Sequence, residues 1–202
     1  MSEGKSDRML QQPIEWLLGK YCQGEYSGYW ANPSSLEDNS RELSKRMYQV
    51  GKYYPSDIAF IHRDTDTFTI ADRTCEINAG VVEANYLTPY ICIIPQRMTE
   101  AWFLFDQDAI RRAADKPRST ARLNLPNANE AQRRADPKSL LERALIDASE
   151  LSGRKLDQFK SDISRRKMLV STLISDYAPL RAHPSFNSFE RELSALIAAQ
   201  GW

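Results

Sequence analysis

The sequence of 202 residues has little cysteine, no net charge and no long apolar run. Its three cysteines, Cys22, Cys75 and Cys92, are widely spaced and odd in number. They indicate neither a disulfide framework nor a zinc ribbon, and we expect reduced thiols. The longest apolar runs, such as 90–95, are far shorter than the roughly 20 residues that cross a bilayer. We therefore expect no membrane span. Because residues 1–7 also lack the apolar core of a secretory signal, we expect a cytoplasmic protein.

The charges cancel over the whole chain but not along it. Residues 1–100 hold 10 Lys and Arg against 14 Asp and Glu, whereas residues 101–202 hold 17 against 13. The zero balance excludes a uniformly basic coat for nucleic acid. The stretch 111–167 nevertheless has 15 basic and 8 acidic residues. Such a stretch is typical either of solvated helix faces with local ion pairs or of a surface that holds a polyanion.

Residues 1–116 alternate helical and β patterns. Helical periodicity covers 6–21, 40–53, 70–84 and 99–114, the last with Thr99 as its N-cap, and 24–35 is typical of a loop. Two short apolar runs predict buried parallel strands: 57–62, which follows a Pro55-Ser56 break, and 90–95, which is bounded by Pro89 and Pro95. The sequence therefore predicts an α/β fold, a parallel sheet flanked by helices, with a ligand site at the carboxyl ends of the strands.

Beyond residue 116 the pattern is helical only. Amphipathic helices are expected over 136–150, 155–177 and 186–199, and 117–126 is typical of a hinge or surface loop between the two parts. Each such helix needs an apolar partner. We therefore expect an α/β core over 1–116 and a helical C-terminal elaboration over 117–202 that packs on it as one compact unit.

Four acidic residues are candidates for a site. Asp64 and Asp66 follow the first predicted strand, and residues two apart in an extended chain point the same way, so the pair can share one Mg²⁺ or Mn²⁺ ion. An Asp-rich turn with Asx hydrogen bonds fits the same spacing. Glu3 precedes the first helix, in a stretch of a kind that often frays. Glu100 follows the second strand at the start of a helix, where the helix dipole also favours a carboxylate.

Basic residues near these acids have two interpretations, as phosphate ligands or as counter-charges to the neighbouring carboxylates. The candidates for phosphate or nucleic-acid binding are Lys5, Arg63, Arg97, Arg165, Arg166 and Lys167. His62, at the end of the first strand, is either a proton donor to a leaving oxygen or a hydrogen-bonded structural residue.

An aromatic cluster lies in the early loop. Tyr26, Tyr29 and Trp30 have no adjacent Lys or Arg. They are suited to stacking on bases or to contact with a partner protein, and the missing positive charge favours the partner. The sequence also lacks a Walker A motif, so we do not expect this chain itself to hydrolyse ATP.

Several of these segments together resemble a known family. Glu3-Gly4-Lys5-Ser6-Asp7 resembles the first, glutamate-bearing motif of Toprim domains, and the segment 61–66 resembles their strand-borne Asp-x-Asp motif. With the segments 73–77, 95–102, 136–138 and 184–186, nearly the whole chain resembles small bacterial Toprim-like proteins of unassigned function. One feature departs from the pattern, since Toprim domains place a hydrophobic strand before the glutamate and only two residues precede Glu3 here.

The resemblance implies a function. It assigns Mg²⁺ or Mn²⁺ to Glu3, Asp64 and Asp66, with Glu100 as an additional ligand or general base, for metal-dependent hydrolysis of phosphodiester bonds in DNA or RNA. Relatives of this kind are often encoded beside ABC-type or AAA-type ATPases in the manner of anti-phage nuclease systems, so an ATPase is the expected protein partner. Two alternatives stay open: a non-catalytic adaptor that docks on the ATPase, and nucleotidyl or phosphoryl transfer at the same centre. The sequence is also compatible with a homo-oligomer.

Overall fold

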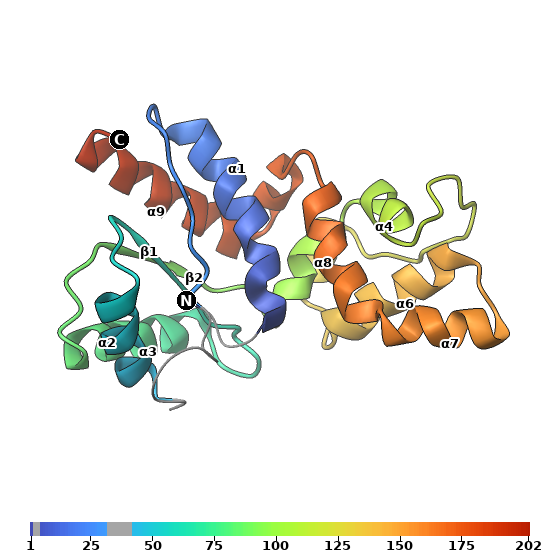
Figure 1. Cartoon of the computed structure of the whole chain (residues 1–202), viewed down its shortest axis with the longest axis horizontal. Coiled ribbons are helices and arrows are strands. Elements are labelled where there is room, and N and C mark those ends of the chain that lie inside the picture. Colours follow the sequence, from blue (N-terminus) through green and yellow to red (C-terminus); the bar gives the residue numbers. More distant parts are fainter. Residues whose placement is uncertain (2–4, 32–41) are drawn as a thin grey trace.

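The computed structural model describes residues 1, 5–31 and 42–202, without the side chains of residues 5, 6, 128 and 129. The fold is mixed α/β and mostly helical (Figure 1). Two strands, β1 (Ala59–His62) and β2 (Tyr90–Ile93), form the one sheet of the described residues. They are parallel, with Ala59 opposite Tyr90 and His62 opposite Ile93. The predicted α/β class and both predicted parallel strands are therefore confirmed.

The helix α3 (Ile70–Glu83) connects the two strands. Its first turn is fixed by a reciprocal capping box: the Asp72 backbone N–H donates to Thr69 Oγ1 at 3.1 Å, and the Thr69 N–H donates to Asp72 Oδ2 at 2.9 Å. This cap holds the loop that leaves β1 against the start of α3, and the candidate site lies in that loop.

Helices cover both faces of the sheet (Figure 1). On one face Ile61 joins an apolar cluster with residues of α2 (Leu43–Tyr53) and α3. On the other face α9 (Pro184–Gln200) packs against β2, and the rings of Phe60 and Phe189 meet edge to face at 6.2 Å. The two apolar faces explain why the strands lack the alternation of apolar and polar residues that a half-exposed sheet shows.

A larger apolar core joins the two parts of the chain. It includes residues from Met9 to Ile197. The fully buried Trp102 meets Phe186 edge to face at a centroid distance of 5.2 Å and stacks on Phe189 at 6.3 Å. The elements around it are η1 (Lys5–Leu10), α1 (Gln11–Tyr21), η3 (Thr99–Phe103), α4 (Gln107–Ala113), α5 (Ala128–Ala131), α6 (Pro137–Ser149), α7 (Gly153–Ser161), α8 (Ile163–Leu173), η4 (Ala178–Ala182) and α9.

Two predicted helices are interrupted. The helix expected over 99–114 is the 3₁₀ turn η3 followed by α4, because the Asp106 carboxylate accepts the Ala109 N–H at 2.9 Å and starts a new helix. Thr99 is the first residue of η3 rather than an N-cap. The helix expected over 155–177 is α7 and α8, which meet at Asp162. Within the part of the chain described here, every helix is too short or too polar to cross a membrane.

Candidate active site at the carboxyl end of the sheet

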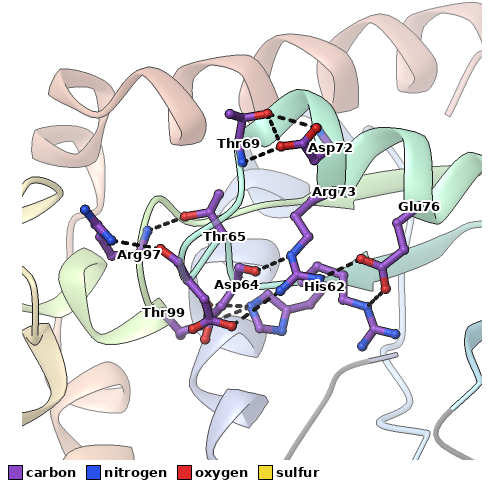
Figure 2. A network of polar contacts seen from close by, with 11 residues as sticks. His62, Asp64, Thr65, Thr69, Asp72, Arg73, Glu76, Arg97 and Thr99 are labelled. Carbon is purple, nitrogen blue, oxygen red and sulfur yellow. Dashed lines mark hydrogen bonds and ion pairs between the residues drawn. The ribbon is translucent and has the colours of Figure 1, made fainter.

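The loops that follow β1 and β2 continue side by side beyond the strands. The Thr65 N–H donates to the Pro95 carbonyl at 3.2 Å, and the Arg97 N–H donates to Thr65 Oγ1 at 2.6 Å (Figure 2). Asp66 and Arg97 both have left-handed backbones, with φ of 49° and 69°. The regular alternation of side chains along β1 therefore ends at Asp66, because that geometry requires an extended chain.

His62 lies buried between two carboxylates. Its Nε2 is 3.1 Å from Asp64 Oδ1, and its Nδ1 is 3.4 Å from Asp7 Oδ2 of η1. Burial by itself lowers the pKa of this imidazole, but the hydrogen bonds and charges of Asp64 and Asp7 outweigh burial and raise that pKa to about 9. His62 is consequently an imidazolium at neutral pH, with its Nε2 hydrogen-bonded to Asp64 and its Nδ1 facing the charge of Asp7.

Asp64 is held at three points. Its Oδ1 receives hydrogen bonds from His62 Nε2 and from Thr99 Oγ1, each at 3.1 Å, and its backbone carbonyl accepts Arg73 Nε at 2.8 Å (Figure 2). The side chain is 18% exposed. A carboxylate fixed in this way, at the carboxyl end of a parallel strand, is in the position where open α/β sheets bind their ligands.

Glu100 and Lys167 continue the site. The Glu100 side chain is 8% exposed, and burial raises the pKa of its carboxyl; the Lys167 charge opposes this rise, and the nearby Asp64 charge adds to it. Lys167 of α8 is itself buried, with Nζ 3.6 Å from Glu100 and 2.8 Å from Glu142 of α6. We call Asp7, His62, Asp64, Glu100 and Lys167 the polar row.

A second group of charges lies on α3. Glu76 accepts Arg63 Nε at 3.0 Å and Arg73 Nη1 at 2.7 Å, and Arg73 Nη2 is 3.4 Å from Asp66 Oδ2. Arg63 and Asp66 therefore contact the α3 side, whereas His62 and Asp64 belong to the polar row. In the structure the carboxylates of Asp64 and Asp66 have different partners.

The three successive basic residues of α8 also have different partners. Arg165 is 69% exposed and pairs with Asp162 of its own turn at 2.7 Å. The guanidinium of Arg166 stacks 4.3 Å over the Phe159 ring and donates to the Ala113 carbonyl at 2.7 Å. Only Lys167 of the three reaches the polar row, because successive helical residues point about 100° apart.

Two predicted site residues are not placed. Glu3 lies outside the described residues, and Lys5 is in η1 but its side chain is not described. Within the described residues no three His, Cys, Asp or Glu side chains form a group that could hold a metal ion. The set of Glu3, Asp64 and Asp66 includes a residue outside that part of the chain and stays a prediction.

Three members of the site were not predicted from the sequence: Asp7, Thr99 as a partner of Asp64, and Glu142. Asp7 meets His62 across 55 positions of the chain, and Glu142 meets Lys167 across 25. Asp7 stands inside the segment that resembles the first Toprim motif, which was a usable signal. Neither local periodicity nor charge pattern marks Thr99 or Glu142.

Comparison of the chain with protein-family models, with curated proteins and with solved structures gives no match. The class that fold and site define is a mixed α/β protein with a buried row of charges at the carboxyl end of its sheet.

Proposed function

We propose that this chain is a Mg²⁺- or Mn²⁺-dependent nuclease of Toprim type, acting on DNA or RNA. One observation carries the proposal. Asp64 and Glu100 follow the two parallel strands, burial raises the pKa of Glu100 and the nearby Asp64 charge adds to that rise, and Lys167 is 3.6 Å from Glu100. Two carboxylates and a cationic side chain at one buried site suit the recognition of a metal ion and a phosphate.

The donor chemistry of this site fits a hard divalent cation. Carboxylate oxygens are the preferred protein ligands of Mg²⁺ and Mn²⁺. Burial and, to a smaller extent, the Asp64 charge raise the pKa of Glu100, and a bound cation would offset both effects. These two residues would hold the ion, and the resemblance adds Glu3 and Asp66 as ligands. When bound, such an ion activates water for attack and offsets negative charge on the phosphate.

The chain's own residues have separate roles in this proposal. Lys167, anchored by Glu142 at 2.8 Å, presents a fixed positive charge beside Glu100 and would bind a phosphate oxygen. His62, whose pKa is about 9, keeps its protons at neutral pH and orients Asp64 through Nε2. We assign His62 a positioning role rather than that of proton donor.

The burial of the site supports a partner. Glu100 and Lys167 are only 6% and 3% exposed, so a nucleic acid reaches them only after the elements around them move apart. An ABC-type or AAA-type ATPase that drives this opening is the partner we propose.

A non-catalytic adaptor is the second candidate. It is favoured by the pairing of the acids, since Asp64 is bonded to His62 and Thr99, and Asp66 is paired with Arg73. In an adaptor, these charged pairs would serve only to stabilise the fold.

Incubation with tRNA, single-stranded DNA and plasmid separates these functions, each with Mn²⁺ or with EDTA and with or without the ATPase. The nuclease gives products in Mn²⁺ only. The adaptor gives none in any arm, and nucleotide turnover without cleavage would instead indicate phosphoryl transfer.

A further inference from the structure

An apolar cavity of about 460 Å³ lies beside the edge of β1 that pairs with Met1, and Ile93 of β2 also lines it. Its walls come from α1, the segment 24–31, α2 and β1. The cavity has the size of a typical ligand pocket. The aromatic cluster of the early loop belongs to its wall, and Tyr29 there is 81% exposed.

The backbone of β1 is open toward this cavity. Ala59 N–H donates to Pro89 on the β2 side at 2.8 Å, and backbone groups alternate in direction along a strand, so Ile58 C=O and Phe60 N–H point to the outer edge. Met1 already pairs there, since its amino group donates to the Phe60 carbonyl and its carbonyl accepts His62 N–H at 2.9 Å. Apart from the β1–β2 ladder, Phe60 N–H makes no backbone–backbone hydrogen bond among the described residues. The outer edge of β1 can therefore pair with another strand, and Ile58 C=O and Phe60 N–H lie on the part of this edge that Met1 does not contact.

The segment 24–31, which forms the opposite wall of the cavity, also belongs to no sheet in the described structure. Residues 24–31 contain no helix or strand, and within the described ranges none of them makes a backbone–backbone hydrogen bond. Figure 1 shows this stretch as an extended trace that descends from the end of α1 toward the N-terminus. An extended peptide between the two walls would meet unpaired backbone on the β1 side and aromatic surface on the other.

Carboxylates are the main charged side chains of the cavity wall, which also includes His62 and the amino group of Met1, both of which already have partners. Its charged carboxylate residues are Glu15, Glu25 and Asp57, and no Lys or Arg lines it in the described part of the chain. A cationic and apolar occupant complements this wall. We propose that the outer edge of β1 is a docking site for an extended, apolar segment of a partner protein that carries Lys or Arg and adds to the sheet as a third strand.

Hydrogen exchange measures this pairing directly. The probe is the blocked peptide Ac-Lys-Val-Ile-Val-Lys-NH₂, added to the full chain. We expect exchange of the Phe60 amide to slow by about tenfold or more at saturation, whereas the Ala59 amide, already bonded to Pro89, changes little. The same peptide with N-methylated backbone nitrogens is expected to leave the Phe60 amide unchanged. Unchanged Phe60 exchange with the first peptide, or equal protection by the methylated one, would overturn the proposal.

Charge reversal tests the recognition. Asp57→Lys is expected to weaken peptide binding by about tenfold at low salt, and Asp108→Lys, on an exposed site of α4, to leave it unchanged. An equal effect of both variants, or equal binding of Ac-Asp-Val-Ile-Val-Asp-NH₂, contradicts the inference. The nuclease proposal does not depend on either result.

Discussion

The two histidines of the chain lie in two buried regions of opposite character. His62, 3% exposed, stands between Asp7 and Asp64, and these partners raise its pKa to about 9 against the effect of burial. His183, 0% exposed, precedes α9, and neither ring nitrogen has a hydrogen-bond partner among the described residues. Burial lowers its pKa to about 4. Burial alone thus favours a neutral ring, and the carboxylates beside His62 reverse that preference.

This difference in surroundings distinguishes a histidine that only packs in the core, His183, from one that belongs to a candidate site, His62. The surroundings of His183 contain apolar core, so its ring serves as a space-filling group at neutral pH. The surroundings of His62 hold charges of both signs that are largely buried. Such charges are costly unless they are paired, and buried perturbed carboxylates are characteristic of functional sites.

The largest expected effect comes from replacing each ring by leucine. His62→Leu leaves the Asp7 and Asp64 carboxylates without their shared cation, and we expect a loss of about 3–5 kcal/mol in the free energy of unfolding at pH 7. His183→Leu removes an unpartnered polar group from an apolar site, and we expect a change within about 1 kcal/mol. Urea unfolding measures both. Equal losses would show that the two rings do not differ as described.

The pH dependence of stability sharpens the same comparison. The pKa of His62 rises from 6.5 in the unfolded chain to about 9 in the folded one, so the folded protein keeps a proton that the unfolded chain releases. The free energy of unfolding therefore falls between pH 6.5 and 9, by about 3 kcal/mol. For His183 the folded pKa is lower, about 4, so its contribution rises from pH 4 to 6.5.

We therefore expect a stability maximum near pH 6.5. His62→Leu should flatten the alkaline limb, and His183→Leu should reduce the slope of the acid limb. NMR titration of the two imidazole rings gives the two pKa values independently. A His62 ring that titrates near its unfolded value would refute the pairing with Asp7 and Asp64.

A smaller contrast is expected within the basic triplet of α8. Lys167→Met removes the cation between Glu100 and Glu142, and we expect a loss of about 2 kcal/mol, because Glu142 retains some contact with water. Arg165→Met removes an exposed pair, and no measurable change is expected. Thermal unfolding of both variants checks this. A similar loss in both would mean that Lys167 is not buried as described.

Much of the sheet could be predicted from the sequence. Each strand is a short apolar run next to proline, and a position just after a parallel strand places Asp64 at the carboxyl end of the sheet. The direction of Asp66 could not be predicted, because its left-handed backbone depends on hydrogen bonds to the loop after β2. Sequence spacing assumes an extended chain, and this assumption fails where a tertiary contact sets φ.

The parts of the site that could not be predicted depend on contacts between residues far apart in the sequence. The pairing of Asp7 with His62 and of Lys167 with Glu142 depends on how η1, α6 and α8 pack, which local periodicity does not encode. The separation of Arg165, Arg166 and Lys167 was available in advance, because three successive residues of a helix cannot share one face.

The proposed role of Asp64 in a metal-dependent nuclease site is tested most directly by the cleavage rate in Mn²⁺ of Asp64→Asn beside Asp108→Asn. Asp108 is 87% exposed and lies on α4, which makes it a matched control for the loss of one charge. With folding verified by circular dichroism, we predict that Asp64→Asn lowers the rate by about a hundredfold or more and that Asp108→Asn retains it. Equal rates in the two variants would contradict the account.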